Sequence, residues 1–249
     1  MAAPRTYRSR CIVLGKTKLK ETDLIVTLLA EDGRQVRAVA KGARKPGSRL
    51  AARCEVCSTV DLLLARGRAL DVVSQAELIA APLGAAPSFE LLSAGAAIVE
   101  AASLGCFEDA SDPFVYPLTE RALAVLGKVG EGAALDLIVA AYIMKLLSHI
   151  GYRPDLTSCV ACGDEAVTYF SAAAGGLLCA SCAASVAGAE EIDANEARWL
   201  AALIGLRFDE LAATAIDART ATLLLAHAHV WAATHLDARL RALEFLLGH

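Results

Sequence analysis

Aromatic side chains are scarce in this chain, and its first third has almost none. Phe, Trp and Tyr make up 5% of the 249 residues, and Tyr7 is the only one among residues 1–88. Proteins that bind single-stranded nucleic acid gain about 1–3 kcal/mol per base by stacking bases on aromatic rings. Any nucleic-acid binding by this segment is therefore expected to depend on charge, to tolerate different sequences and to accept duplex as well as single strands.

The sequence also lacks a segment with the features of a membrane span or a signal peptide. The longest apolar stretch, residues 133–147, is too short for a span and contains Asp136 and Lys145. Residues 1–10 contain three arginines but no apolar stretch follows them. We expect a soluble cytoplasmic protein without membrane partners. In that compartment the eight cysteines are expected to bind metal or to stay buried as thiols, not to form disulfides.

Patterns typical of catalytic sites are missing too. The Gly-Lys-Thr at residues 15–17 resembles the end of a phosphate-binding loop, but Arg10 stands where that motif has its first glycine. We find no His-x-Glu as in zinc deaminases and no pattern that indicates a Ser-His-acid triad. His227 and His229 are two residues apart, so they cannot share a helix face and are expected in or beside the core. We do not expect an enzyme; an enzyme with an unfamiliar site stays an alternative.

Charge is divided unevenly along the chain, although the net charge is only −4. Residues 1–80 contain 15 Lys and Arg against 8 Asp and Glu, whereas residues 81–249 contain 9 against 20. A positively charged segment of this kind is typical of a module that binds a polyanion. The acidic remainder is rich in Ala and Leu, which favours packed helices.

The basic segment has the periodicity of short β-strands. Apolar or alternating runs predict five strands, at residues 10–15, 22–30, 35–41, 56–64 and 70–78, with turns at residues 31–33 and 65–68. Five short strands within eighty residues suit a small barrel of the OB type. We therefore predict an OB-type barrel at residues 1–80.

The rest of the chain has the signals of helices. We predict helices at residues 88–106, 113–128 and 134–150, one starting near residue 193, and one from about residue 217 to residue 247. Ser88, Asp112 and Asp193 are the expected N-caps, with Glu196 completing a capping box. The predicted fold class is α+β, with a helical domain at residues 81–249.

Four cysteines have the spacing of a zinc knuckle inserted between these helices. Sixteen residues separate two Cys-x-x-Cys pairs, Cys159 with Cys162 and Cys179 with Cys182. The two-residue gap lets both thiolates of a pair face one ion, and two pairs complete a tetrahedral shell for Zn²⁺. Since four thiolates leave no open position, such an ion would be structural. The knuckle is expected at about residues 157–184; the alternative is four buried or unpaired cysteines.

Other cysteines are expected to behave as small apolar side chains. Cys54 and Cys57 form a third Cys-x-x-Cys, but no second pair accompanies them, and in an extended strand their thiols would face opposite ways. We expect both to be buried, as we do for Cys11 and Cys106.

A basic loop follows the third predicted strand. Residues 41–53 include five Lys and Arg and no acid, and Lys16, Lys18 and Lys20 form another basic turn. Arg37 and Lys41 share a strand face because alternate side chains point the same way. Such a patch attracts phosphates by releasing counterions; with about five phosphates bound, log affinity would fall with log salt at a slope between about −3 and −5. The alternative is an ordinary solvated loop.

Three stretches of the sequence resemble the RecO family of bacterial recombination mediators, and together they extend over nearly the whole chain. The first is Tyr-Arg-Ser-Arg-Cys-Ile-Val-Leu at residues 7–14 with Glu-Thr-Asp-Leu-Ile-Val-Thr-Leu-Leu at residues 21–29. The second is Ala-Lys-Gly-Ala-Arg-Lys-Pro-Gly-Ser-Arg-Leu at residues 40–50 with the turn at residues 66–71. The third, residues 151–163 with 170–171 and 175–182, is the most specific because it joins a helix end to both cysteine pairs.

The resemblance implies an OB barrel, a helical domain with a zinc knuckle, binding of single- and double-stranded DNA, and annealing of complementary strands. The implied partners are RecR and the single-stranded-DNA-binding protein, whose acidic C-terminal tail would dock on the helical domain, and the implied role is to help load RecA at the nucleoid. By match to the family's basic loop, with the neighbouring basic positions added, the candidate DNA contacts are Lys16, Arg37, Lys41, Arg44, Lys45 and Arg49.

One departure concerns residues 54–57, Cys-Glu-Val-Cys, where relatives tend to have a Pro-Phe-type turn. A zinc-containing RNA-binding or transcription-associated adaptor and a pure protein scaffold are the alternative functions.

Overall fold

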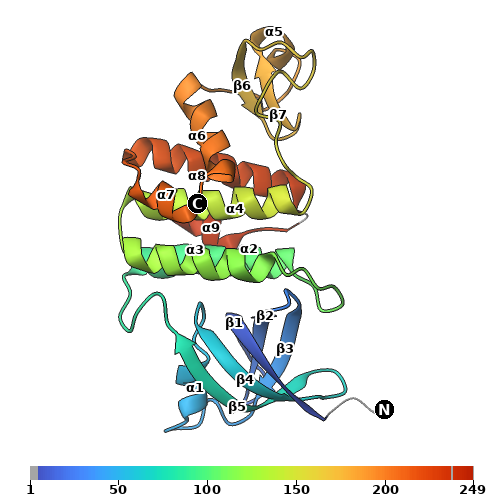
Figure 1. The fold of residues 1–249 in the computed structure, drawn as a ribbon, viewed down its shortest axis with the longest axis vertical. Helices are drawn as coiled ribbons and strands as arrows, with labels where there is room; N and C mark the ends of the chain where they lie inside the picture. Colours follow the sequence, from blue (N-terminus) through green and yellow to red (C-terminus); the bar gives the residue numbers. More distant parts are fainter. Residues whose placement is uncertain (1–4, 237, 249) are drawn as a thin grey trace. The chain divides into compact units, whose positions relative to one another are not determined.

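The computed structural model describes residues 5–236 and 238–248, which divide into two compact units after Gly130. The first unit contains a five-stranded barrel and helices α1 to α3, and the second contains the other helices and a small sheet (Figure 1). None of the described helices has both the length and the apolar character needed to cross a bilayer. The predicted α+β class is confirmed.

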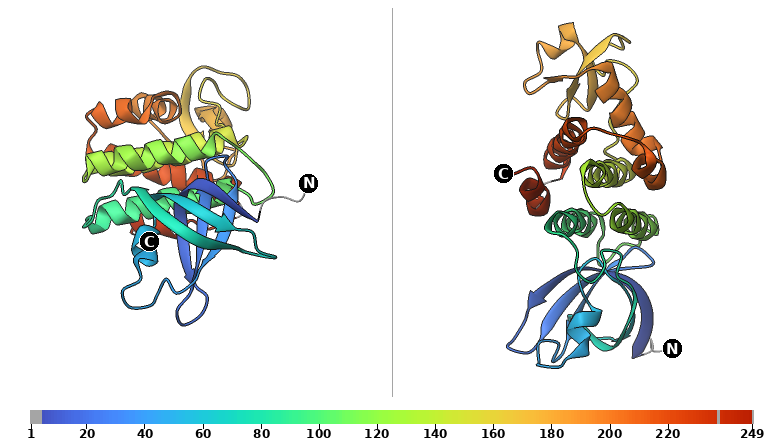
Figure 2. Two further views of the ribbon diagram at one scale, coloured as in Figure 1. Left: turned by 60° about the horizontal axis from the view of Figure 1, so that its bottom comes forward. Right: turned by 90° about the vertical axis from the view of Figure 1, so that its left-hand side faces the viewer.

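Five strands close into a barrel in the order β1-β2-β3-β5-β4 (Figure 2). They are β1 Thr6–Lys18, β2 Leu24–Ala30, β3 Gln35–Ala40, β4 Thr59–Ala65 and β5 Asp71–Ala80. Strand β1 pairs with β4 through its first half and with β2 through its second half, while β3 and β5 are parallel. This is the OB-type barrel that the sequence predicts.

Alternate side chains of every strand fill the barrel, because neighbouring residues of a strand point to opposite faces. The buried side chains of this core are Cys11, Val13, Val26, Leu28, Ala30, Ala38, Ala40, Ala43, Cys54, Val60, Leu62, Leu64, Val73 and Ala76. Strand β1 extends beyond the predicted run at residues 10–15 at both ends. Basic and uncharged residues alternate at these ends, as in Arg8 and Arg10 with Tyr7 and Ser9, so neither end contains an apolar run.

A short helix, α1 Arg49–Arg53, interrupts the loop that was predicted between β3 and β4. Leu50 and Ala51 pack against the barrel core, and the Arg53 guanidinium donates a hydrogen bond to the carbonyl of Ala76 at 2.9 Å. Cys54 ends this helix within the barrel core, and Cys57 has a positive φ of 69°. Both thiols are buried as predicted, and β4 begins at Thr59, three residues after the predicted strand start at residue 56.

Two helices complete the first unit, α2 Phe89–Gly105 and α3 Val115–Val129. Ser88 caps α2 as predicted, by accepting a hydrogen bond from the Leu91 N–H at 3.2 Å. Helix α3 begins two residues later than predicted. The Asp112 carboxylate instead accepts the N–H of Phe114 in the turn before the helix.

The segment between α2 and α3 is fastened to the turn between β2 and β3. The Gln35 N–H donates to the carbonyl of Phe107 at 3.0 Å, and the Ser111 hydroxyl donates to the carbonyl of Asp32. Gly33 has φ +85°, and a Cβ placed on it would lie 1.7 Å from the Asp112 carbonyl oxygen. Only glycine therefore fits this contact.

The second unit is built around α4 Ala133–His149, whose middle is buried on all sides. The other helices are α6 Ala194–Gly205, α7 Phe208–Ala213, α8 Ala218–His235 and α9 Arg241–Leu246. Asp193 and Glu196 form the predicted capping box of α6. The prediction of one helix from residue 217 to residue 247 is wrong, because α8 ends at His235 and α9 begins at Arg241.

A small sheet that the sequence did not predict lies between α4 and α6 in the chain. Its strands are β6 Val167–Ser171, β7 Gly176–Cys179 and β8 Glu190–Glu191, in the order β7-β6-β8, and the short helix α5 Ala180–Ala183 follows β7. Leu178, Val167 and Tyr169 pack together with the cysteines beside this sheet. The cysteine-containing segment thus has a hydrophobic cluster of its own.

Candidate metal centre and nucleic-acid interface

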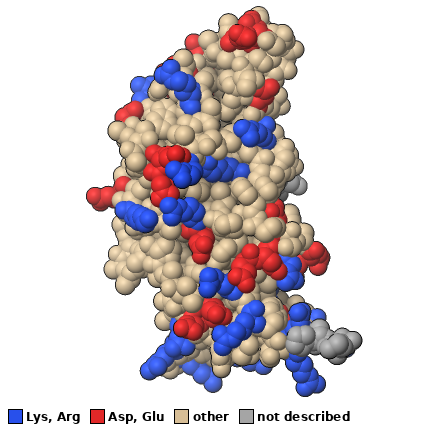
Figure 3. All heavy atoms as spheres, viewed as in Figure 1, with Lys and Arg blue, Asp and Glu red and all other residues tan. Residues whose placement is uncertain are grey.

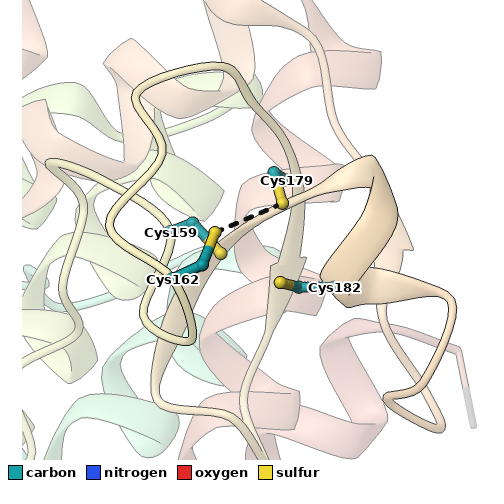
Figure 4. A group of neighbouring side chains, drawn as sticks. All are labelled: Cys159, Cys162, Cys179 and Cys182. Atoms are coloured by element: carbon teal, nitrogen blue, oxygen red, sulfur yellow. Dashed lines mark hydrogen bonds between the residues drawn. The ribbon is translucent and has the colours of Figure 1, made fainter.

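The four cysteines with zinc-knuckle spacing come together at one point (Figure 4). Their Sγ atoms all lie within 4.8 Å of one another, and those of Cys162 and Cys179 are 3.7 Å apart. A tetrahedral ion with Zn–S bonds of about 2.3 Å places its sulfurs about 3.8 Å apart. The four side chains, Cys159, Cys162, Cys179 and Cys182, therefore fit a single metal ion.

The backbone holds the two pairs in this arrangement. The loop that carries the first pair is closed by the Cys159 N–H, which donates to the carbonyl of Asp164, and by the Gly163 N–H, which donates to the carbonyl of Cys159, both at 2.8 Å. The second pair lies at the junction of β7 and α5. The turn thus places Cys159 and Cys162, and the end of β7 places Cys179 and Cys182, so that the two pairs face one another.

Backbone amides around the cysteines favour thiolates. The N–H of Cys179, together with those of Ala161 and Cys162, lowers the pKa of the Cys159 thiol to about 6. The neighbouring cysteines, with Cys179 first, raise the pKa of the Cys182 thiol to about 12. The Ser181 hydroxyl lowers the pKa of the Cys179 thiol as well. The neighbouring cysteines therefore oppose a thiolate at Cys182, and a bound cation would remove that opposition. When bound, the ion would cross-link the two pairs and supply no chemistry beyond that.

Aromatic contacts attach this knuckle, residues 157–191, to α8. The Phe170 ring of β6 lies 5.5 Å from the Trp231 ring and 5.4 Å from the His227 ring, the latter edge-on. The Trp231 Nε1–H donates to the carbonyl of Tyr152 at 2.9 Å. His227 is buried and burial lowers its pKa, whereas His229 is half-buried. Both histidines lie where the sequence predicts, in and beside the core.

Five of the predicted basic residues, Lys18, Lys20, Lys41, Arg44 and Lys45, lie on two turns that hydrogen bonds join. The Asp23 carboxylate accepts the N–H of Gly42 at 2.8 Å, and the Arg44 N–H donates to the carbonyl of Thr22 at 2.9 Å. The Arg44 guanidinium donates to the carbonyls of Lys20 and Glu21, at 3.2 and 2.9 Å. We call this assembly of residues 18–23 and 41–45 the basic clasp.

Four lysines of the basic clasp project into solvent. They are Lys18, Lys20, Lys41 and Lys45, and none of them forms an ion pair with any residue that the structure describes. Figure 3 shows Lys and Arg side chains around the lower end of the view, over the barrel. The Asp23 carboxylate, which holds the clasp, stays ionised because the Gly42 N–H lowers its pKa, and the four lysines with Arg44 outnumber the two acids of the clasp, Glu21 and Asp23. The clasp therefore presents a concentrated positive charge.

The six candidate DNA contacts differ in their freedom to bind a ligand. Arg37, Lys41, Lys45 and Arg49 are exposed. Lys16 instead forms an ion pair with Glu55 at 2.6 Å, and the Arg44 guanidinium is occupied by two carbonyls of the clasp. Lys16 and Arg44 therefore stabilise the surface through contacts within the protein. The sequence analysis missed Asp23, for which the only signal is an acid shortly after the basic run at residues 16–20.

The exposed face of β2 and β3 adjoins the clasp. Arg37 lies opposite Thr27 and Val39 lies opposite Ile25, and these four side chains point away from the barrel core, because Ala38 and Ala40 point into it. Polar and apolar groups therefore alternate along a shallow surface that leads to Lys41.

Comparison with known proteins agrees with this architecture. The family model described as "Recombination protein O N terminal" matches residues 1–82, and "Recombination protein O C terminal" matches residues 86–244. This chain belongs to the RecO family. Proteins named "DNA repair protein RecO" from Bifidobacterium longum strain DJO10A and Frankia casuarinae are similar to it. The first is 37% identical over 209 residues, which cover 82% of each chain, and the second is 35% identical over 244 residues, which cover 96% of this chain and 98% of the other.

A third relative, the RecO of Cutibacterium acnes, is 38% identical over 184 residues, which cover 71% of this chain and 74% of its own length. The two family models meet between residues 82 and 86, close to the change in composition, whereas the compact units of the structure divide at Gly130. In this chain, α2 and α3 lie in the same compact unit as the barrel.

Proposed function

We propose that this protein is a non-enzymatic mediator of DNA repair and recombination that binds single- and double-stranded DNA through its barrel and anneals complementary strands. Membership of the family supports the biological role. The observation that supports the mode of binding is the basic clasp, whose four exposed lysines form no ion pair with the described residues. Each would gain a phosphate partner on binding and release counterions.

Annealing follows from where the charge lies. Two complementary strands repel one another, and a positively charged surface that contacts both phosphate chains lowers this repulsion. Residues 5–80 contain one aromatic side chain, so the surface leaves most base edges free to pair. Contacts by Arg37, Lys41, Lys45 and Arg49 are the ones the exposed geometry favours, with Lys18 and Lys20 added to the earlier candidates.

The knuckle in this proposal holds one structural Zn²⁺. Four cysteines at 4.8 Å or less are the donor set that Zn²⁺ takes in closed sites, and no water position is left for catalysis. The proposed partners are RecR and the single-stranded-DNA-binding protein, with its acidic C-terminal tail docking on the helical unit, and the complex would act at the nucleoid to help load RecA. Docking of the tail on the helical unit is tested by measuring whether the full-length protein binds a peptide with the tail sequence and fails to bind a peptide without it.

Charge reversal on the clasp tests the DNA-binding proposal. The double variant Lys41→Glu/Lys45→Glu should lose annealing of complementary oligomers and bind both single and double strands at least tenfold more weakly, with unchanged zinc content. Lys128→Glu, an exposed lysine on α3, is the matched control and should behave as the wild type. Annealing that survives in the double variant would refute the clasp as the DNA site. Tighter binding to RNA than to DNA of the same sequence would favour the RNA adaptor instead, because only RNA offers the 2′-hydroxyl.

A further inference from the structure

The single aromatic side chain of the barrel lies beneath an arginine. Tyr7 of β1 pairs with Leu64 of β4, next to the turn at residues 66–70, and its ring packs partly against the barrel core. The Arg66 guanidinium carbon lies over this ring, 4.8 Å from its centroid. Attraction between a guanidinium and an aromatic face holds such a pair together.

This pair is held in place from both sides. The Tyr7 hydroxyl donates a hydrogen bond to one carboxylate oxygen of Asp71, and the other oxygen accepts the Gly67 N–H at 3.0 Å. The Arg66 N–H donates to the carbonyl of Arg5 at 2.9 Å. Asp71 thus fixes the ring and the turn that carries Arg66 together, so the guanidinium is positioned before any ligand arrives.

Both arginines of the turn are open to a ligand. Arg66 and Arg68 are exposed, and in the part of the chain that the structure describes neither forms an ion pair. A guanidinium that covers a ring on one side offers its other side to a second planar group. Nucleobases that are not paired stack on guanidinium planes as they do on aromatic rings.

The turn flanks the strand that leads to the basic clasp. Asp71 and Val72 pair with Ala38 and Val39 of β3, and Lys41 follows Ala38 by three residues, about 10 Å along the strand. Arg37 projects outward one residue before Ala38. One nucleic-acid strand whose phosphates lie on the clasp can therefore continue to the turn.

We propose that Tyr7 and Arg66 form a stacking site for one unpaired base, with Arg68 contacting the adjoining phosphate. This inference rests on the proposed DNA binding and adds to it a preference for single strands, because the bases of a duplex are already stacked and paired. It also limits base contact to a single position, which leaves the rest of the strand free to anneal.

The test compares an oligothymidylate with an abasic strand of the same length, which keeps the phosphates and lacks the bases. The variant Arg66→Lys keeps the charge and removes the guanidinium plane; Arg34→Lys, at the turn between β2 and β3, is the matched control. Fluorescence anisotropy at one salt concentration gives the affinity ratio of the two strands. Wild type and Arg34→Lys should prefer the strand with bases by about fivefold or more, and Arg66→Lys should bind both strands equally.

A ratio near one for the wild type, or an unchanged ratio in Arg66→Lys, would overturn the stacking site while leaving charge-driven DNA binding intact. Failure of the wild type to bind either strand would instead refute the proposed DNA binding, and the stacking site with it. The two failures are therefore distinguishable. The thermal midpoint of Arg66→Lys should equal that of the wild type, because the substituted side chain is exposed.

Discussion

The carboxylate of Asp23 and the backbone N–H of Gly42 are 2.8 Å apart, and their hydrogen bond joins two basic turns separated by 19 positions in the sequence. An acid in the middle of a positively charged surface weakens phosphate binding if charge alone is considered. Here it also fixes the place of Lys41 and Lys45 relative to Lys18 and Lys20. Removing the Asp23 side chain should therefore strengthen DNA binding if only the net charge matters, and weaken it if the positions of the lysines matter.

We predict that Asp23→Ala weakens DNA binding by about three- to tenfold, although the substitution removes a negative charge. Loss of one well-formed hydrogen bond to a carboxylate corresponds to about 1 kcal/mol or more. Glu21→Gln is the control, because it removes a neighbouring exposed acid whose side chain does not hold the clasp; its binding should be unchanged or tighter. Trypsin should also cleave after Lys41 and Arg44 faster in Asp23→Ala. Tighter DNA binding by Asp23→Ala would show that only the net charge matters.

Replacement of Gly33 should destabilise the first unit. In Gly33→Ala the new Cβ meets the Asp112 carbonyl at 1.7 Å, and the left-handed backbone at this position adds strain. We expect the free energy of unfolding to fall by about 2–4 kcal/mol, measured by urea denaturation. Gly15→Ala on β1, where no atom lies within 4 Å of the new Cβ, should stay within about 0.5 kcal/mol of the wild type. Equal stability of the two variants would contradict the close contact.

Removal of the metal should unfold the knuckle and leave the barrel folded. The purified protein should contain about one zinc per chain, and Cys179→Ser should contain almost none, because three thiolates and a hydroxyl bind zinc far more weakly. Hydrogen exchange in residues 157–191 should rise after chelation, whereas residues 5–80 should stay protected. Cys54→Ala, a buried thiol outside the cluster, should keep its zinc. A full complement of zinc in Cys179→Ser would refute the four-cysteine site.

Lys145 should make stability depend on pH in the alkaline range. Its ammonium on α4 donates to the carbonyls of Ile204 and Leu206 at the end of α6, and burial lowers its pKa from 10.5 to about 8. Between pH 8 and 10.5 the unfolded chain binds a proton at this site that the folded chain has lost, so the site's contribution to stability increases with pH. Because the side chain is partly exposed, we expect this contribution to be only about 1 kcal/mol.

The comparison that isolates this effect is Lys145→Met. The variant should be less stable at pH 7.5, because two carbonyls lose their donor, and the gap to the wild type should widen at pH 9.5. Urea denaturation of both proteins at the two pH values measures the difference, in which the other titrating groups cancel. A gap that narrows at pH 9.5 would show that the folded protein prefers the charged lysine.

Features set by nearby residues were predictable from the sequence. The spacing of the cysteines allows each pair to face one ion, and Ser88 and Asp193 cap their helices through groups three residues away. The five strands also followed from alternation. Helix α3 was predicted two residues early, because Asp112 can serve the turn before the helix as well as the helix itself.

Features that depend on distant contacts were not predictable in the same way. Helix α1 forms where its apolar residues reach the barrel core, and no local signal distinguishes it from a loop. The knuckle sheet is different, since Val-Thr-Tyr-Phe-Ser at residues 167–171 is rich in β-branched and aromatic residues and could have been identified as a strand. The break between α8 and α9 has neither glycine nor proline, and Asp237 lies outside the described residues.

The pairing of β1 with β4 has a consequence for how this protein can assemble. Within residues 5–80 each of the five strands has two neighbours, although β3 and β5 share only the pairs Ala38 with Asp71 and Val39 with Val72. Closure leaves little open strand edge to which a partner, or a second copy on the same DNA molecule, could add a strand. We therefore expect recruitment of other proteins to depend mainly on side chains, loops and helices, which can be changed by substitution without reopening the barrel.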